Sequence, residues 1–294
     1  MGEYVRSENI GTAWRDAFTR IVDAGGDQVN LMVDIVNPLE EDLGVRDALQ
    51  LRLADLKISG RSAFAQVQSM HTVANTIFPV GLYRPGAPDA AERFIANVVR
   101  SERLRERTRG SRWGTYAGRL VAYPGRNGAP VNQLERILEV LRKDLDYKDR
   151  YEVPLWEPAN DLPLAATSSS ATLHGDSVSD NRARGGPCLA HISFTSFGGA
   201  LSMTAVYRRH EYEQRAYGNF LGLARLLHFL AKESGRAVGN LLVVASHAST
   251  ESPAAPDFAA TLAGLEPRPA TIELTARPLG VGTSDLDLPE PRKL

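Results

Sequence analysis

Residues 187–209 read PCLAHISFTSFGGALSMTAVYRR, and this stretch decides the fold. Apolar and polar residues nearly alternate from Leu189 to Thr195 and again from Ala200 to Tyr207, which is typical of strands with one buried face. The glycine pair Gly198-Gly199 between the two runs is typical of a tight turn. The sequence therefore predicts two antiparallel strands joined as a hairpin.

The chain's single cysteine, Cys188, lies at the start of the first strand, directly after Pro187. A thiol becomes a nucleophile only as the thiolate, and nearby cations lower its pKa. The candidate cations are Arg182, Arg184, Arg208 and Arg209. A lone cysteine is also commonly a small buried hydrophobe. The residue types alone leave both interpretations open.

Regular elements continue on the C-terminal side of the hairpin. A long amphipathic helix is predicted to open at Asn219 and to run to Lys232, because its leucines and Phe220 recur on one face. His228 on this helix is interpreted as structural. An apolar run from Leu241 to Ala245 predicts a buried strand that ends near His247.

Pro187-Cys188, Arg208 and Asn219 follow one another in the order and spacing of the thymidylate synthase motifs, so the chain resembles that family. Further stretches are similar to family motifs in the same order: 116–120 (YAGRL), 132–134 (NQL), 156–163 (WEPANDLP), 238–240 (VGN) and 265–272 (LEPRPATI). The resemblance implies an α+β fold with a mixed sheet flanked by helices, and a homodimer packed through its sheets.

In that family a cysteine adds to C6 of a pyrimidine nucleotide, and C5 then takes a one-carbon unit from methylenetetrahydrofolate. The resemblance therefore implies a transferase that adds a methyl or hydroxymethyl group, with Cys188 as the nucleophile. The substrate-binding residues that it implies are Arg208, Arg209 and Arg150 for the phosphate, Asn219 for the base, and Tyr116 and Ser249 elsewhere in the site.

Several motif positions depart from the family pattern. Ala74 stands where the family has its proton-relaying glutamate, and Asp149 replaces one arginine of an adjacent pair. The family's Asp-x-His-x-Tyr aligns with His247, Ser249 and Glu251. Histidine is the side-chain type whose ordinary pKa lies nearest neutral pH, so His247 is the expected replacement acid–base group. The alternatives are a catalytically inactive nucleotide-binding or scaffolding relative, and a family member whose substrate is not a nucleotide.

Composition sets the broad class. The 294 residues are 43% hydrophobic and 23% charged, with a net charge of −1, which is ordinary for a soluble globular protein and argues against a general nucleic-acid binder. One cysteine excludes a disulfide framework. No run approaches the ~18 apolar residues of a membrane helix, and no signal peptide is evident, so a cytoplasmic location is expected. The histidine and acid spacing predicts no metal site.

We expect a single domain over residues 1–280, with an insertion loop at about 164–186 and a flexible tail at 281–294. The loop is rich in Ser, Thr, Asp and Gly, so it is either an active-site lid or an inert surface insertion. Further elements are predicted as helices at 10–24, 89–105 and 131–145 and strands at 28–36 and 270–276. Gly11-Thr12 is expected to cap the first helix.

Overall fold

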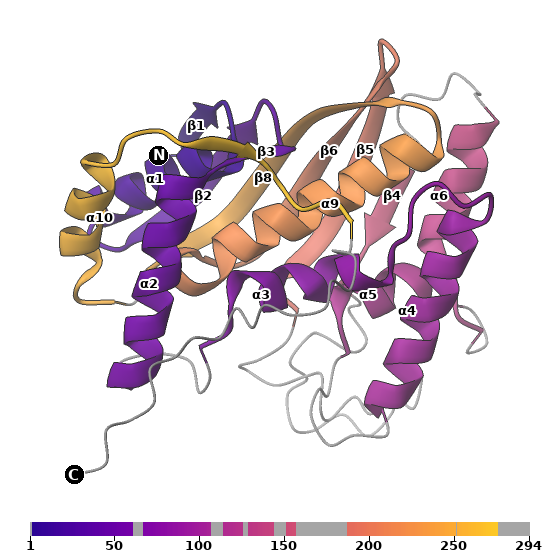
Figure 1. The fold of residues 1–294 in the computed structure, drawn as a ribbon, viewed down its shortest axis with the longest axis horizontal. Coiled ribbons are helices and arrows are strands. Elements are labelled where there is room, and N and C mark those ends of the chain that lie inside the picture. The colour runs from indigo at the N-terminus through magenta and orange to yellow at the C-terminus, as the bar shows by residue number, and fades with distance from the viewer. Residues whose placement is uncertain are drawn as a thin grey trace, which may run out of the picture.

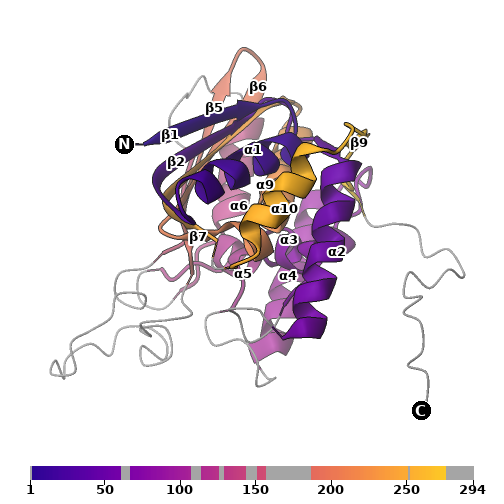
Figure 2. The same cartoon turned by 90° about the vertical axis from the view of Figure 1, so that its left-hand side faces the viewer.

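The computed structural model describes residues 2–60, 67–106, 114–125, 129–143, 151–156, 187–250 and 252–275. These residues form an α+β fold in which helices pack on a seven-stranded mixed sheet (Figures 1 and 2), which confirms the predicted class. The strands of this sheet are β1 (Glu3–Ser7), β2 (Asp27–Ile35), β4 (Tyr151–Pro154), β5 (Leu189–Phe197), β6 (Ala200–Tyr207), β7 (His210–Glu211) and β8 (Ala237–Ser249).

The strand order is β1-β2-β8-β6-β5-β4, and the short β7 also pairs with β8. A separate two-stranded sheet joins β3 (Glu40–Asp42) to β9 (Pro269–Thr271). The helices are α1 (Ile10–Asp23), α2 (Leu43–Ser59), α3 (Met70–Ile77), η1 (Val80–Leu82), α4 (Ala90–Glu106), α5 (Tyr116–Val121), α6 (Gln133–Arg142), the π-helix η3 (Tyr212–Ala216), α9 (Tyr217–Glu233) and α10 (Ala255–Ala263). The expected loop at 164–186 and tail at 281–294 lie outside the described residues.

The predicted hairpin is confirmed as β5 and β6, which pair antiparallel with Phe197 opposite Ala200. Gly198 and Gly199 make the turn with φ of 59° and 78°, a conformation that disfavours any side chain. In β6 buried and half-buried residues alternate along the whole strand. The alternation of apolar and polar residues in the sequence therefore indicates which face of the strand is buried.

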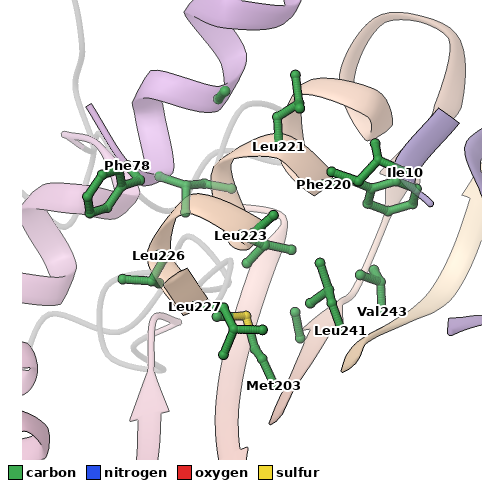
Figure 3. Close-up of a cluster of buried hydrophobic side chains, with 14 of the residues drawn as sticks. Ile10, Phe78, Met203, Phe220, Leu221, Leu223, Leu226, Leu227, Leu241 and Val243 are labelled. Atoms are coloured by element: carbon green, nitrogen blue, oxygen red, sulfur yellow. The ribbon is translucent and has the colours of Figure 1, made fainter. Parts of the chain in front are cut away.

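Helix α9 is the centre of the core. It is buried along almost its whole length, from Tyr217 to Ala231. Figure 3 shows Leu223 and Leu227 directed toward strand side chains that include Met203 and Leu241, which are also buried. The burial of apolar area between α9 and β6 and β8 is the main stabilising contribution that the sequence encodes here.

Three predicted boundaries are wrong. Helix α1 is capped by Asn9, and Thr12 closes the capping box from the third position. Asn219 lies within the first turn of α9, because η3 runs directly into that helix at Tyr217. The last strand covers only 269–271, and it pairs with β3 in place of the main sheet.

Two glycines on α9 let α3 approach closely. A Cβ on Gly218 would lie 2.6 Å from the carbonyl oxygen of Met70, and a Cβ on Gly222 would lie 2.7 Å from that of Ala74. Real Cβ atoms do not come so near to backbone oxygen. The position of α3 therefore depends on the absence of side chains at these two sites.

Gly222→Ala should lower the free energy of unfolding by about 1–3 kcal/mol through overpacking, despite the helix-propensity gain of alanine. Gly81→Ala is the matched control, since its Cβ would meet nothing within 4 Å. Urea unfolding of both variants measures the difference. Equal stability of the two variants would contradict the close approach of α3.

Candidate active site

One edge of the main sheet gathers most of the residues that the sequence singled out. Leu189 at the start of β5 lies opposite Tyr207 at the end of β6, so Cys188 and Arg208 are neighbours. Tyr207 pairs with Ala245 of β8, and Glu211 of β7 pairs with Ser249. The register therefore brings Cys188, the arginine pair and Ser249 to the same edge.

Two side chains hold the backbone around Cys188. The Tyr116 hydroxyl oxygen accepts the amide N–H of Cys188 at 2.9 Å and that of Leu189 at 3.2 Å. Arg208 donates its amide N–H to the Cys188 carbonyl at 3.0 Å and its Nε to the Pro187 carbonyl at 2.8 Å. The structure thus joins three predicted site residues.

The electrostatics of Cys188 differ from the prediction. Burial raises the pKa of the Cys188 thiol, and the guanidinium groups of Arg208, Arg209 and Arg215 lower it only in part, so the net shift is upward. The sequence predicted a lowered pKa from the same arginine pair. The thiol form therefore prevails at neutral pH in this state of the protein.

Asn219, the predicted base-reading amide, contacts a residue that the sequence analysis missed. Its Nδ2 lies 3.0 Å from Nε2 of His210, and both side chains are buried. The His210 ring stacks on Tyr207 with centroids 4.0 Å apart and 5° between planes, and it meets the edge of Tyr212. Burial lowers the pKa of His210 to about 3, so its imidazole is neutral at physiological pH. Its place directly after Arg208-Arg209 was the only signal in the sequence.

The same edge holds buried polar atoms whose hydrogen-bonding capacity is unmet among the described residues. They are the hydroxyls of Tyr207 and Tyr212, Nδ1 of His210, Oγ of Ser249 and Oγ1 of Thr250. All five side chains are at most 9% exposed. Such groups are costly unless something bonds to them, and they cluster at functional sites. Their arrangement suits a ligand that brings neutral donors and acceptors.

Charged groups surround this neutral interior. Arg208 and Arg209 are exposed, whereas Arg215 is half-buried and donates to Oε1 of Gln68. The Glu211 carboxylate accepts the amide N–H groups of Glu213 at 3.1 Å and Gln214 at 2.7 Å, and burial raises its pKa to about 8. Arg215 was not among the predicted site residues. Its electrostatic effect on Cys188 makes it a third arginine of this edge.

His247, the predicted acid–base residue, has a partner on the other side of β8. Its Nε2 lies 2.7 Å from Oδ1 of Asp27, on β2, whereas Cys188 lies toward β6. Asn30 of β2 has a positive φ of 53°, and no Asn30–Ser246 pair is present in the β2–β8 ladder. Arg150 lies outside the described residues, so its predicted phosphate contact has no structural counterpart here.

Helix α3 offers no acid or base at the position that the resemblance compares with a catalytic glutamate. Ala74 is fully buried against α9, and the neighbouring Asn75 accepts the amide N–H of Val80 at 3.3 Å. Proton transfer at this site must therefore use other groups.

No protein-family model matches this chain, and no curated protein matches it. Over the described residues, no group of three or more His, Cys, Asp or Glu side chains could hold a metal ion. None of the helices in the same residues is long and apolar enough to cross a membrane.

The alkylation rate of Cys188 by iodoacetamide should rise with a midpoint above pH ~8.5, the pKa of an ordinary thiol. Arg209→Gln should raise that midpoint further, because a cation that stabilises the thiolate is lost. Arg84→Gln, an exposed change beside η1, is the control and should leave the midpoint unchanged. A midpoint below that of a free thiol would contradict the dominance of burial.

Proposed function

We propose that the chain binds a pyrimidine nucleotide at the sheet edge around Cys188 and adds a one-carbon group, methyl or hydroxymethyl, to C5 of the base. The observation that carries the proposal is the set of buried neutral groups near Cys188 that have no hydrogen-bond partner among the described residues, with exposed arginines next to them. A base and sugar supply neutral donors and acceptors, and arginine forks suit a phosphate. The resemblance to thymidylate synthases supports the same assignment.

In the proposed reaction the Cys188 thiol gives up its proton and its sulfur bonds to C6 of the ring, so that the electron pair of the C5–C6 double bond makes C5 nucleophilic. C5 would then bond to the methylene carbon of the donor as the bond from that carbon to a folate nitrogen breaks. A hydride from the same folate would leave a methyl group, and water would leave a hydroxymethyl group. Loss of the C5 proton and departure of the sulfur restore the double bond. Methylenetetrahydrofolate is the one-carbon donor that the resemblance implies.

The proton steps need groups near the ring. The Tyr116 hydroxyl lies against the backbone amides of Cys188 and Leu189, and the Glu211 carboxyl lies at the same edge with a pKa of about 8. His247 would take part only if its imidazole left Asp27. We therefore propose Tyr116 and Glu211 ahead of His247 for this work.

A second candidate function is a nucleotide-binding relative without catalysis. The buried Ala74 favours it, because the α3 position compared with the family's glutamate cannot transfer a proton. The two candidates share the ligand and differ in what Cys188 does.

Deoxyuridine or deoxycytidine monophosphate at 100 times its Kd should stabilise the native state by about 2.7 kcal/mol, seen as a rise in Tm. In the transferase, methylenetetrahydrofolate should add to this rise in wild type and less in Cys188→Ala. Equal rises in both proteins would favour the binding relative. No rise with any pyrimidine nucleotide at millimolar concentration would overturn both candidates.

We also propose that a second copy of the chain covers the outer face of the sheet. Figure 2 shows the helices stacked against the opposite face. Half-buried or exposed side chains on the outer face include Tyr4, Met32, Val206, Leu242 and Val244. Met32 pairs with Val244 and Val206 with Val244, so these apolar residues are contiguous across three strands. A homodimer packed through sheets, as the resemblance implies, would bury this patch.

Val244→Arg should convert the dimer to a monomer, because it places a charge at the centre of the contact. Ile58→Arg on the exposed side of α2 is the matched control, since Ile58 is 85% exposed on the helical side. Light scattering after size exclusion measures both masses. A wild-type monomer, or a dimer that survives Val244→Arg, would contradict this interface.

A further inference from the structure

The hydrogen bond between Asn219 and His210 leaves the tautomer of the imidazole open. Nε2 of His210 lies 3.0 Å from the Asn219 side-chain amide. Its other nitrogen, Nδ1, is buried and has no hydrogen-bond partner among the described residues. In most buried histidines the second nitrogen bonds to a carbonyl or carboxylate, and that bond selects the tautomer. His210 has aromatic neighbours in that place: Tyr207 stacks on it, and Tyr212 and Phe220 meet it edge to face.

Each tautomer fits one orientation of the Asn219 amide. With the proton on Nδ1, Nε2 accepts from Nδ2 of Asn219, as the atoms are placed here. With the proton on Nε2, the imidazole donates to Oδ1, and the amide is turned by 180°. The amide keeps a hydrogen bond to His210 in both arrangements. The pair can therefore reverse the order of donor and acceptor that Asn219 presents on its free edge.

Uracil and cytosine differ by the same reversal. Uracil presents a donor at N3 and an acceptor at C4, whereas cytosine presents an acceptor at N3 and a donor at C4. Starting from the proposed nucleotide site, we propose that His210 is a positioning residue whose two neutral tautomers let Asn219 bind both uracil and cytosine nucleotides. The amide turns with the base, and the imidazole proton moves to the opposite nitrogen.

A neutral imidazole is required for this exchange, because the protonated ring has two donors and no acceptor. The residues packed around His210 favour the neutral imidazole. His210 is 1% exposed, its ring is packed by Tyr207, Tyr212 and Phe220, and its hydrogen-bond partner among the described residues is an uncharged amide. The acidic neighbour along the chain, Glu211, directs its carboxylate to the amides of residues 213 and 214. The ratio of the two Kd values should accordingly be constant between about pH 6 and 8, because the phosphate and its titration near pH 6 are common to both nucleotides.

The test has a binding arm and a spectroscopic arm. Calorimetry gives the Kd of deoxyuridine and deoxycytidine monophosphate for wild type, His210→Phe and the control His228→Phe. Two-dimensional ¹⁵N spectra of histidine rings give the tautomer of His210 in each complex, and the signals are assigned by their loss in His210→Phe. Phenylalanine keeps the stack on Tyr207, whereas His228 lies on α9 away from the Asn219 contact.

Wild type should bind the two nucleotides with Kd values within about threefold, and the protonated nitrogen of His210 should differ between the two complexes. His210→Phe should weaken binding of both about 3- to 10-fold, the loss expected for one hydrogen bond, and His228→Phe should not. One tautomer in both complexes, or a preference above about 30-fold for one base, would overturn the inference while the proposed nucleotide site stands. Failure of wild type to bind either nucleotide would overturn the proposed function and this inference together.

Discussion

The register of the β5–β6 hairpin is the constraint on which the rest of the site depends. Because Leu189 lies opposite Tyr207, Cys188, just before β5, lies next to Arg208, just after β6. The parallel pairing of β6 and β7 with β8 then adds Ser249 to that edge. A slip of one residue would turn every side chain of the hairpin to the other face and separate the thiol from the arginines. The glycine turn at 198–199 and the α9 core fix the register from His191 to Phe197, and an irregularity between Leu189 and His191 sets the pairing beside the site.

Burial gives the site its chemical character. The same packing that gathers the groups removes them from water, and this favours the neutral form of each. The pKa of Cys188 rises, the pKa of His210 falls to about 3, and the pKa of Glu211 rises to about 8. The charged groups are the exposed side chains of Arg208 and Arg209, which lie beside this interior. A ligand that is neutral at one end and anionic at the other matches this division.

Local patterns in the sequence predicted the hairpin, the long helix and the strand at 241–245, because alternation and helical periodicity report directly which face is buried. The resemblance to thymidylate synthases, and no local pattern, implied that Tyr116, Arg208 and Cys188 share one site. His210 and Arg215 escaped prediction because their roles depend on the β7–β8 pairing and on the π-helix η3, which carry no periodic signal. The Asp27 partner of His247 follows from the β2–β8 register, which places His247 opposite Val29, and this pairing of distant segments has no local signal in the sequence.

The central claim is that the Cys188 sulfur bonds to C6 of a bound pyrimidine. Proton NMR of deoxyuridine and deoxycytidine monophosphate in D₂O with the protein measures this without any one-carbon donor. Addition of sulfur at C6 lets C5 take a deuteron, and loss of the original proton with elimination of sulfur returns a deuterated nucleotide. The account predicts that the H5 signal of at least one nucleotide decays with wild type and persists with Cys188→Ala. A nucleotide that binds wild type while its H5 signal persists as it does with Cys188→Ala would contradict the account.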